Sequence, residues 1–142
     1  MARERQSGPR VVVEQLSGRR AEGPGKWLVA WRIENRGEGT LRLLSGRLPH
    51  SLFRCDEREL GALPALRPNE RARLEFPVRC AEPPGMIVEN AFLILGVLWR
   101  EEPWRILARL RVLIDREGAP QTATELITTQ RVGFSMPMKR EG

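Results

Sequence analysis

Residues 86–115 constrain the fold most, because they hold two long apolar runs separated by a short polar break. Across 91–99 the apolar residues occupy both alternating positions, which is typical of a strand covered on its two faces. Across 104–114 apolar residues alternate with arginines, which predicts a strand with one exposed face. The break at 100–103 is polar and contains a proline. The whole stretch therefore predicts a β-hairpin.

The other strand-like segments are also short, and they end at Gly, Pro or Asn residues that favour turns. The alternation is clearest across 71–79, where Pro77 falls on the outward set and indicates an edge strand or a position that needs no donor. No segment has a helical period. About seven such strands predict an all-β fold, an antiparallel β-sandwich. The residues expected between its two sheets are Trp31, Phe76, Phe92, Leu95 and Leu110.

Three turn sequences support a more specific expectation. They are Trp-Arg-Ile-Glu-Asn-Arg-Gly at 31–37, Leu-Arg-Pro-Asn-Glu at 66–70 and Pro-Pro-Gly at 83–85. Over roughly residues 10–115 this pattern resembles bacterial immunoglobulin-like modules, and the resemblance implies an immunoglobulin-like β-sandwich used for binding or spacing. Asn69 departs from the glycine usual in such modules. The chain also has no tyrosine, so the tyrosine corner of antibody-type domains is impossible.

The chain divides into three expected parts: a flexible arm at 1–8, the immunoglobulin-like sandwich at 9–116 and an extended C-terminal tail at 117–142. The tail has too much apolar surface for a soluble linker and too little for a core of its own. We expect it to dock on its own domain's open edge, on a second copy or on a partner. The residues of the tail expected to bind are Leu126, Ile127 and Phe134.

Charge leaves a second function class open. The net charge is +6, from 24 basic and 18 acidic residues, and the two signs are interleaved along the chain. Arg105, Arg109 and Arg111 share one face of the predicted strand at 104–114, so a basic accessory domain that contacts nucleic acid is the alternative function. Such binding needs an unneutralised basic strip with exposed aromatic rings beside it. The interleaved acids favour a mixed, solvated surface instead.

The tryptophans and the reactive side chains have two interpretations each. Trp99 and Trp104 flank the hairpin turn, so they either pack in the core or act as exposed anchors for a partner. Cys55 and Cys80 could form a bridge, or one of them could pair with His50, but two free thiols fit better. No further Cys or His stands at metal-binding spacing. We therefore expect no metal, no cofactor and no enzymatic activity.

The chain shows neither a secretory signal nor an apolar run of the roughly 18 residues that a membrane span needs, so a cytoplasmic location is expected. Taken together, the sequence predicts a non-enzymatic protein-interaction or structural module. It would act through its sheet edges and the docking tail, with a protein partner or as a homo-oligomer.

Overall fold

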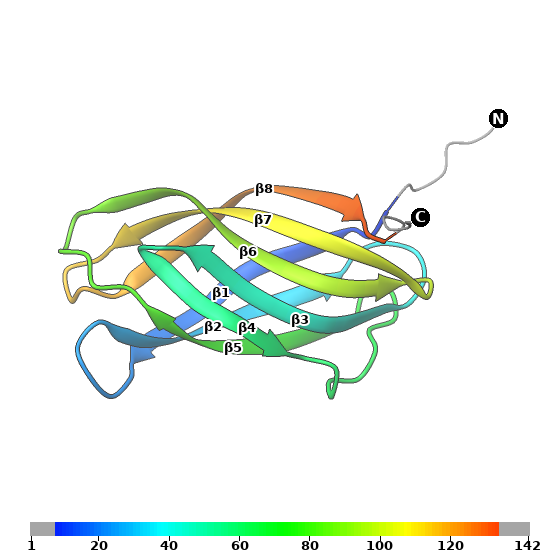
Figure 1. The fold of residues 1–142 in the computed structure, drawn as a ribbon, viewed down its shortest axis with the longest axis horizontal. Helices are drawn as coiled ribbons and strands as arrows, with labels where there is room; N and C mark the ends of the chain where they lie inside the picture. Colours follow the sequence, from blue (N-terminus) through cyan, green and yellow to red (C-terminus); the bar gives the residue numbers. More distant parts are fainter. Residues whose placement is uncertain (1–7, 134–142) are drawn as a thin grey trace, which may run out of the picture.

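The computed structural model describes residues 8–133, which form antiparallel β-strands and, over that range, no helix (Figure 1). Consequently, nothing in this part of the chain could cross a membrane as a helical span. Most of the predicted arm at 1–8, and Phe134, lie outside the described residues. The strands are β1 (Val11–Arg20), β2 (Lys26–Asn35), β3 (Leu41–His50), β4 (Phe53–Glu59), β5 (Arg71–Arg79), β6 (Ile87–Trp99), β7 (Glu102–Ile114) and β8 (Pro120–Arg131).

All eight strands belong to one sheet in the order β1-β2-β5-β4-β3-β6-β7-β8. They run along the long axis of the molecule, with the connecting loops at its two ends (Figure 1). Within the described residues, one residue pair, Arg54 with Arg79, joins β4 to β5. The sheet therefore curls into a nearly closed barrel in which strand pairing is least extensive between these two strands.

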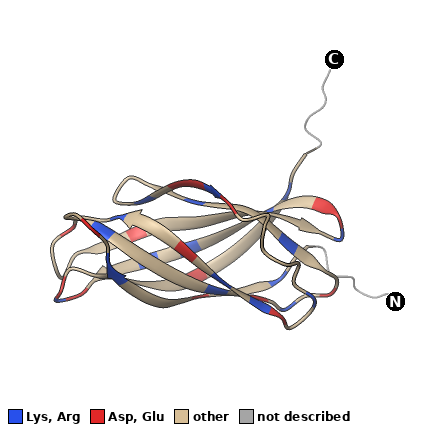
Figure 2. Ribbon diagram, turned by 90° about the horizontal axis from the view of Figure 1, so that it is seen from below, with Lys and Arg blue, Asp and Glu red and all other residues tan. Residues whose placement is uncertain are grey.

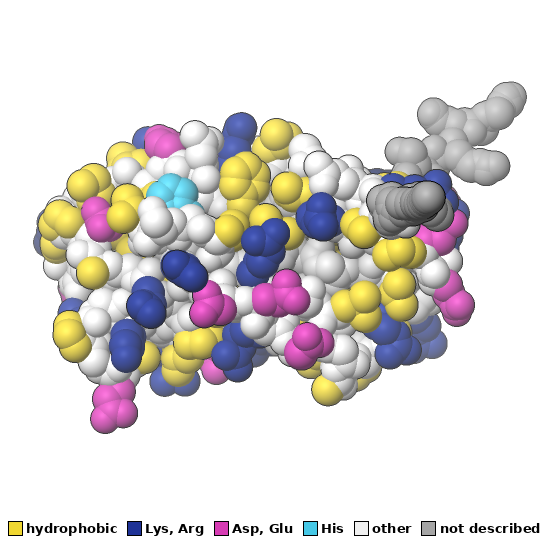
Figure 3. Space-filling model, viewed as in Figure 1, with side chains coloured by type: hydrophobic (Ala, Val, Ile, Leu, Met, Phe, Trp, Pro, Cys, Tyr) yellow, Lys and Arg dark blue, Asp and Glu magenta, His cyan; other side chains and the backbone are white. Residues whose placement is uncertain are grey.

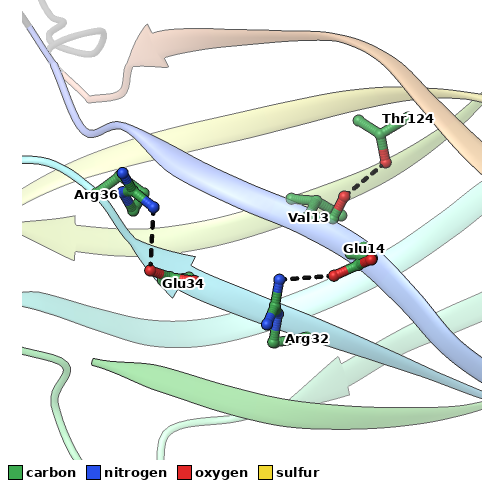
Figure 4. A network of polar contacts seen from close by, with 6 residues as sticks. All are labelled: Val13, Glu14, Arg32, Glu34, Arg36 and Thr124. Carbon is green, nitrogen blue, oxygen red and sulfur yellow. Dashed lines mark hydrogen bonds and ion pairs between the residues drawn. The ribbon is translucent and has the colours of Figure 1, made fainter. Parts of the chain in front are cut away.

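The two ends of the sheet meet through side chains (Figure 4). Thr124 Oγ1 on β8 donates a hydrogen bond to Val13 O on β1 at 2.8 Å. Gln15 reaches across the same seam, donating from Nε2 to Pro120 O at 3.1 Å and accepting at Oε1 from Thr122 N at 2.7 Å. Side-chain amide and hydroxyl groups thus take the place of a backbone ladder at this seam.

The prediction of an all-β, antiparallel fold is confirmed, but the expected division into about seven strands in two sheets is corrected. The segment 120–131, placed by sequence in a C-terminal tail, forms β8 and pairs with β7 from Ile114↔Pro120 to Trp104↔Arg131. Its Thr-rich composition suits a strand, and the edge of β7 supplies its backbone partners. Of the surfaces considered for this segment, its own domain's edge is the one it occupies.

The core fills the inside of the barrel. Trp31, Phe76, Leu95 and Leu110 are fully buried, as predicted. Trp31 contacts both Phe53 and Phe76 edge to face, at centroid distances of 6.1 and 5.8 Å, which is a favourable geometry for aromatic rings.

The placement of Phe92 in the core is wrong. On β6 the inward set is Ala91, Leu93, Leu95, Val97 and Trp99, so Phe92 points outward and is half-buried. The register of β6 against β7 shifts between Val88 and Ala91, where Asn90 has a positive φ of 58°. In a run that is apolar at every position, alternation alone cannot show which set faces inward. The bulge, which the apolar pattern does not reveal, sets that choice.

The predicted hairpin between β6 and β7 is confirmed. Its turn is shorter than the polar break, because β7 begins at Glu102 and Pro103 pairs with Leu98. Arg100 and Glu101 have φ values of 52° and 65°. Positive φ at both central residues is the requirement of a type I′ turn, whose twist matches that of the flanking strands.

Candidate protein-interaction surface

The outer face of β6 and its neighbours carries apolar side chains. Phe92 and Ile94 on β6 and Leu107 on β7 are half-buried, and Leu126 on β8 is 49% exposed. Strand register makes them neighbours, since Ile94 pairs with Leu107 while Phe92 and Leu126 both pair with Arg109. We call these four residues the outer apolar patch. Hydrophobic side chains gather over β6 to β8 in Figure 3, and no other described strand lies on top of them.

A groove crosses the same face next to the patch. Its volume is about 240 Å³, and it is lined by side chains of β3, β4, β6 and β7 together with Val132. Gly96 forms part of its floor, where an added Cβ would come within 2.8 Å of Ser45 Oγ. Ser45 Oγ thus occupies the space that a side chain at Gly96 would need, so the floor of the groove is formed here by Ser45 and the Gly96 backbone.

A second exposed apolar group lies at the other end of the outer face. Ile87 pairs with Leu113, and their exposed fractions are 41% and 47%. Met86 precedes them in the chain and is 41% exposed. An ion pair between Arg111 and Glu89, at 3.3 Å, is formed on the stretch of β6 and β7 that separates this group from the outer apolar patch.

The three arginines of the predicted basic face do lie on one side of their strand, but neighbouring glutamates partly neutralise their charge. Arg105, Arg109 and Arg111 all lie on the outward side of β7. Arg109 Nε is 3.7 Å from Glu125 Oε1, Arg111 is paired with Glu89, and Arg105 Nη1 donates to Gln130 Oε1 at 3.3 Å. Basic and acidic positions are interspersed over the barrel in Figure 2. Two of the three arginines on this face are therefore paired with glutamates, and nucleic-acid binding stays a prediction.

Trp99 and Trp104 do not form exposed anchors. Their exposed fractions are 4% and 8%, and their rings meet edge to face at 5.7 Å. Trp99 Nε1 also donates to Glu38 O at 2.7 Å, which fixes the indole at the end of the core. Ile127 points inward and packs against the core, so of the two predicted tail residues that the structure describes, Leu126 is the one with exposed apolar surface. Phe134 is outside the described range.

The exposed sheet edges carry features that oppose pairing with another strand. Pro77 lies on the stretch of β5 that has no partner on the β4 side, as its predicted edge position requires. Arg71, Arg73 and Glu75 are exposed on the same strand. The end of β4 that does not pair with β5, residues 56–59, consists entirely of charged residues. Charged side chains and proline are the usual means of protecting an edge from strand addition.

Among the described hydrogen bonds, none joins the residues considered for catalysis to one another. His50 Nδ1 accepts a hydrogen bond from Leu52 N within the β3–β4 turn, and Cys55 Sγ contacts Asp56 O. Cys55 and Cys80 are both free and buried, in agreement with the two-thiol interpretation. Burial raises the pKa of each thiol, which disfavours the reactive thiolate. No three of the described His, Cys, Asp and Glu side chains group in a way that could hold a metal ion.

The sequence carried one overlooked signal for this surface. The apolar residues on both faces of 91–99 indicated a covered strand, whereas the barrel covers its inner face alone. Comparison with known proteins gives no match, whether with family models, with curated proteins or with solved structures. The function must therefore be argued from the surface itself.

Proposed function

We propose that this chain is a non-enzymatic protein-interaction module, and that it binds a protein partner through the outer apolar patch. One observation carries the proposal: β6 is apolar on two faces, and the outer one is not covered within the described chain. Isolated surface leucines are ordinary, but a contiguous apolar group on a sheet face is typical of an interface. Fully covering one such side chain contributes roughly 1.5–3 kcal/mol to association.

The sheet face is a better binding surface than the sheet edges that the sequence suggested. Pro77 and the charged side chains of β4 and β5 disfavour strand addition, and the β1–β8 seam is occupied by Gln15, Thr122 and Thr124. Arg105 and Arg111 flank the patch on β7 and suit a rim role, whereas Arg109 lies between Phe92 and Leu126 and is paired with Glu125. Rim charges of this kind steer association more than they strengthen it.

The test compares two sets of surface substitutions in the full-length chain. Leu107→Asp combined with Leu126→Asp places two carboxylates in the patch. Leu16→Asp is the matched control, because Leu16 is 46% exposed on β1, away from the patch. Affinity capture from the native host, with quantitative mass spectrometry, should recover the same partner with the wild type and with Leu16→Asp. The double variant should lose that partner while its thermal unfolding remains cooperative.

Two outcomes would contradict the proposal. The double variant could retain the partner at the wild-type level, or Leu16→Asp could lose it equally. Sedimentation velocity on the purified proteins identifies a homodimer as the partner, because association would then depend on concentration and disappear in the double variant alone.

We also propose that the barrel is built on the immunoglobulin-like plan. The strand order supports this reading when it is divided at the weak β4–β5 contact, which gives β1-β2-β5 and β4-β3-β6-β7, with β8 added beside β7. Two free buried thiols are compatible with a cytosolic setting, which remains part of the proposal.

A further inference from the structure

The described chain ends at the rim of the groove on the outer face. Val132 lines the groove, and its N–H donates to Pro103 O, another lining residue, at 3.0 Å. Gly133 follows with a φ of 106°, a left-handed conformation that glycine adopts readily. Such a residue can turn the chain away from the direction of β8. Residues 134–142 therefore begin where the groove begins.

The groove leads from this rim across the neighbouring strands. Its lining passes from Arg105 on β7 to Ile94 on β6, then to Arg47 on β3 and Glu57 on β4. Three steps between neighbouring strands amount to about 14 Å, at about 4.8 Å for each step. The seven residues that follow Val132, up to Lys139, can reach roughly 23 Å when extended. The remaining chain is long enough to cross the whole groove.

The chemistry of the segment matches that of the groove. Phe134, Met136 and Met138 alternate with polar residues or proline, so an extended chain would place all three on one side. The groove offers apolar contact from Leu44 and Ile94, over a floor to which Ser45 and the Gly96 backbone contribute. Its far end offers a carboxylate.

Charge also matches at that far end. Glu57 is the one acidic side chain among the described residues that line the groove, and it forms no ion pair with the described part of the chain. Lys139 and Arg140 follow Met138 directly, and Glu141 follows them. Glu57 suits one of the two cations, and Arg47 beside it suits Glu141. Beyond Arg105 at the near end, the groove passes from apolar Ile94 to charged Arg47 and Glu57, and the segment likewise passes from apolar to charged residues.

We propose that residues 134–140 dock in cis across this groove, with Phe134 and Met136 over Gly96 and Ile94 and with Lys139 or Arg140 at Glu57. Docking covers Ile94, the one residue of the outer apolar patch that lines the groove, and leaves Leu107 and Leu126 open, because neither of these two lines it. The inference therefore does not rest on the proposed partner site, and either proposal can fail without the other.

The test uses amide NMR spectra of the full-length protein. Phe134→Ser combined with Met136→Ser removes the apolar contacts, and Ser135→Ala is the control within the same segment. The double variant should shift the amide signals of Leu44, Ser45 and Gly96, which lie far from the substitutions in sequence. Signals from β2 and β5, on the other side of the barrel, should remain in place. Changes confined to residues 130–142 would overturn the proposal.

A second arm tests the charged end. Glu57→Gln should reproduce part of the shifts at Leu44 and Ser45 and should make the segment's own amide signals narrower and less dispersed. Glu22→Gln removes an exposed carboxylate from the β1–β2 loop, outside the groove, and should leave those signals unchanged. Equal effects of the two variants would show that Glu57 has no specific role.

Dilution separates docking in cis from docking between copies. The groove signals of the wild type should keep their positions when the protein concentration falls tenfold, since an intramolecular contact does not depend on concentration. Signals that move toward those of the double variant on dilution would assign the segment to a second copy and overturn the cis proposal.

Discussion

Asn35, at the end of β2, holds two loops together through its side chain. Nδ2 donates to Gly39 O and to Leu66 O, both at 3.0 Å, and Oδ1 accepts from Gly37 N at 3.0 Å. Its backbone adds bonds to Glu70 and Asn69, and the residue is fully buried. One amide therefore joins the β2–β3 turn to the segment before β5.

Replacing Asn35 by Ala should destabilise the protein strongly. Three hydrogen bonds are lost and the Leu66 carbonyl remains buried without this donor, so the expected loss is roughly 3 kcal/mol of unfolding free energy. Urea denaturation followed by tryptophan fluorescence measures it. Gln130→Ala, which removes an exposed amide from β8, should cost less than about 0.5 kcal/mol. A midpoint for Asn35→Ala within error of the wild type would contradict this role.

Single residues show what the sequence could and could not specify. Asn69 stands where the resembling modules have glycine, and its φ of 73° accounts for both residue types at that place. Asn35 was expected as a turn former, because the pattern of a turn is local. Its partners at Leu66 and Glu70 are about thirty residues away, and no local pattern identifies them.

At the scale of elements, alternation predicted the strands well where one face is polar. The inward set of β7, from Trp104 to Ile114, agrees with its alternating pattern. On β6 the pattern is apolar throughout, so it predicted a strand but left Phe92 on the wrong side. The outer apolar patch and the groove at Gly96 depend on which side chains of β6 face outward and on pairing between four strands. Neither could therefore be predicted from the sequence of one segment.

Asp115 organises the turn between β7 and β8. Its Oδ1 accepts from Ala119 N at 2.8 Å and from Glu117 N at 3.0 Å, and Oδ2 accepts from Gln121 Nε2 at 3.1 Å. The hydrogen bond from the Ala119 backbone is the main reason why the pKa of this carboxyl lies below its ordinary value, with smaller contributions from Gln121 and Glu117. The ionised form is therefore favoured in the folded state.

Asp115→Asn should make stability less dependent on acidic pH. Because the folded-state pKa is lowered, the carboxylate stabilises the fold above its unfolded pKa of about 4, and this contribution disappears as the pH falls through the folded pKa. The variant should thus be less stable than the wild type near neutral pH, and the difference should shrink as the pH falls through the lowered pKa of the folded state. Urea midpoints across this range measure it. Glu117→Gln, in the same turn, is the control, and a difference that is constant with pH would contradict the prediction.

At the scale of the molecule, the fold depends on how the two ends of the sheet meet. The sequence predicted that the tail would dock on its own domain's open edge, on a second copy or on a partner, and β8 occupies the domain's own edge along β7. It did not predict that β8 would also come beside β1, because this contact depends on the curl of all eight strands. The bulge in β1 between Gln15 and Ser17 lies at this seam, where Gln15 reaches β8.

Gln15→Ala should open the seam between β1 and β8 while the ladders on either side persist. The substitution removes the hydrogen bonds to Pro120 O and from Thr122 N. Each intramolecular hydrogen bond of this kind contributes about 1 kcal/mol, so a total loss of about 2 kcal/mol of unfolding free energy is expected. Hydrogen exchange should accelerate by roughly tenfold or more at the Thr122 amide and its neighbours, since local opening there becomes easier. Exchange rates of amides in the centre of β6, which pairs with β3 and β7, should change only as much as the global stability changes.

Thr128→Ala, on the exposed side of β8, supplies the control because Thr128 makes no seam contact among the described hydrogen bonds. Uniform acceleration across the whole sheet would mean that the barrel opens as one unit, and Gln15 would then have no local role in closing it.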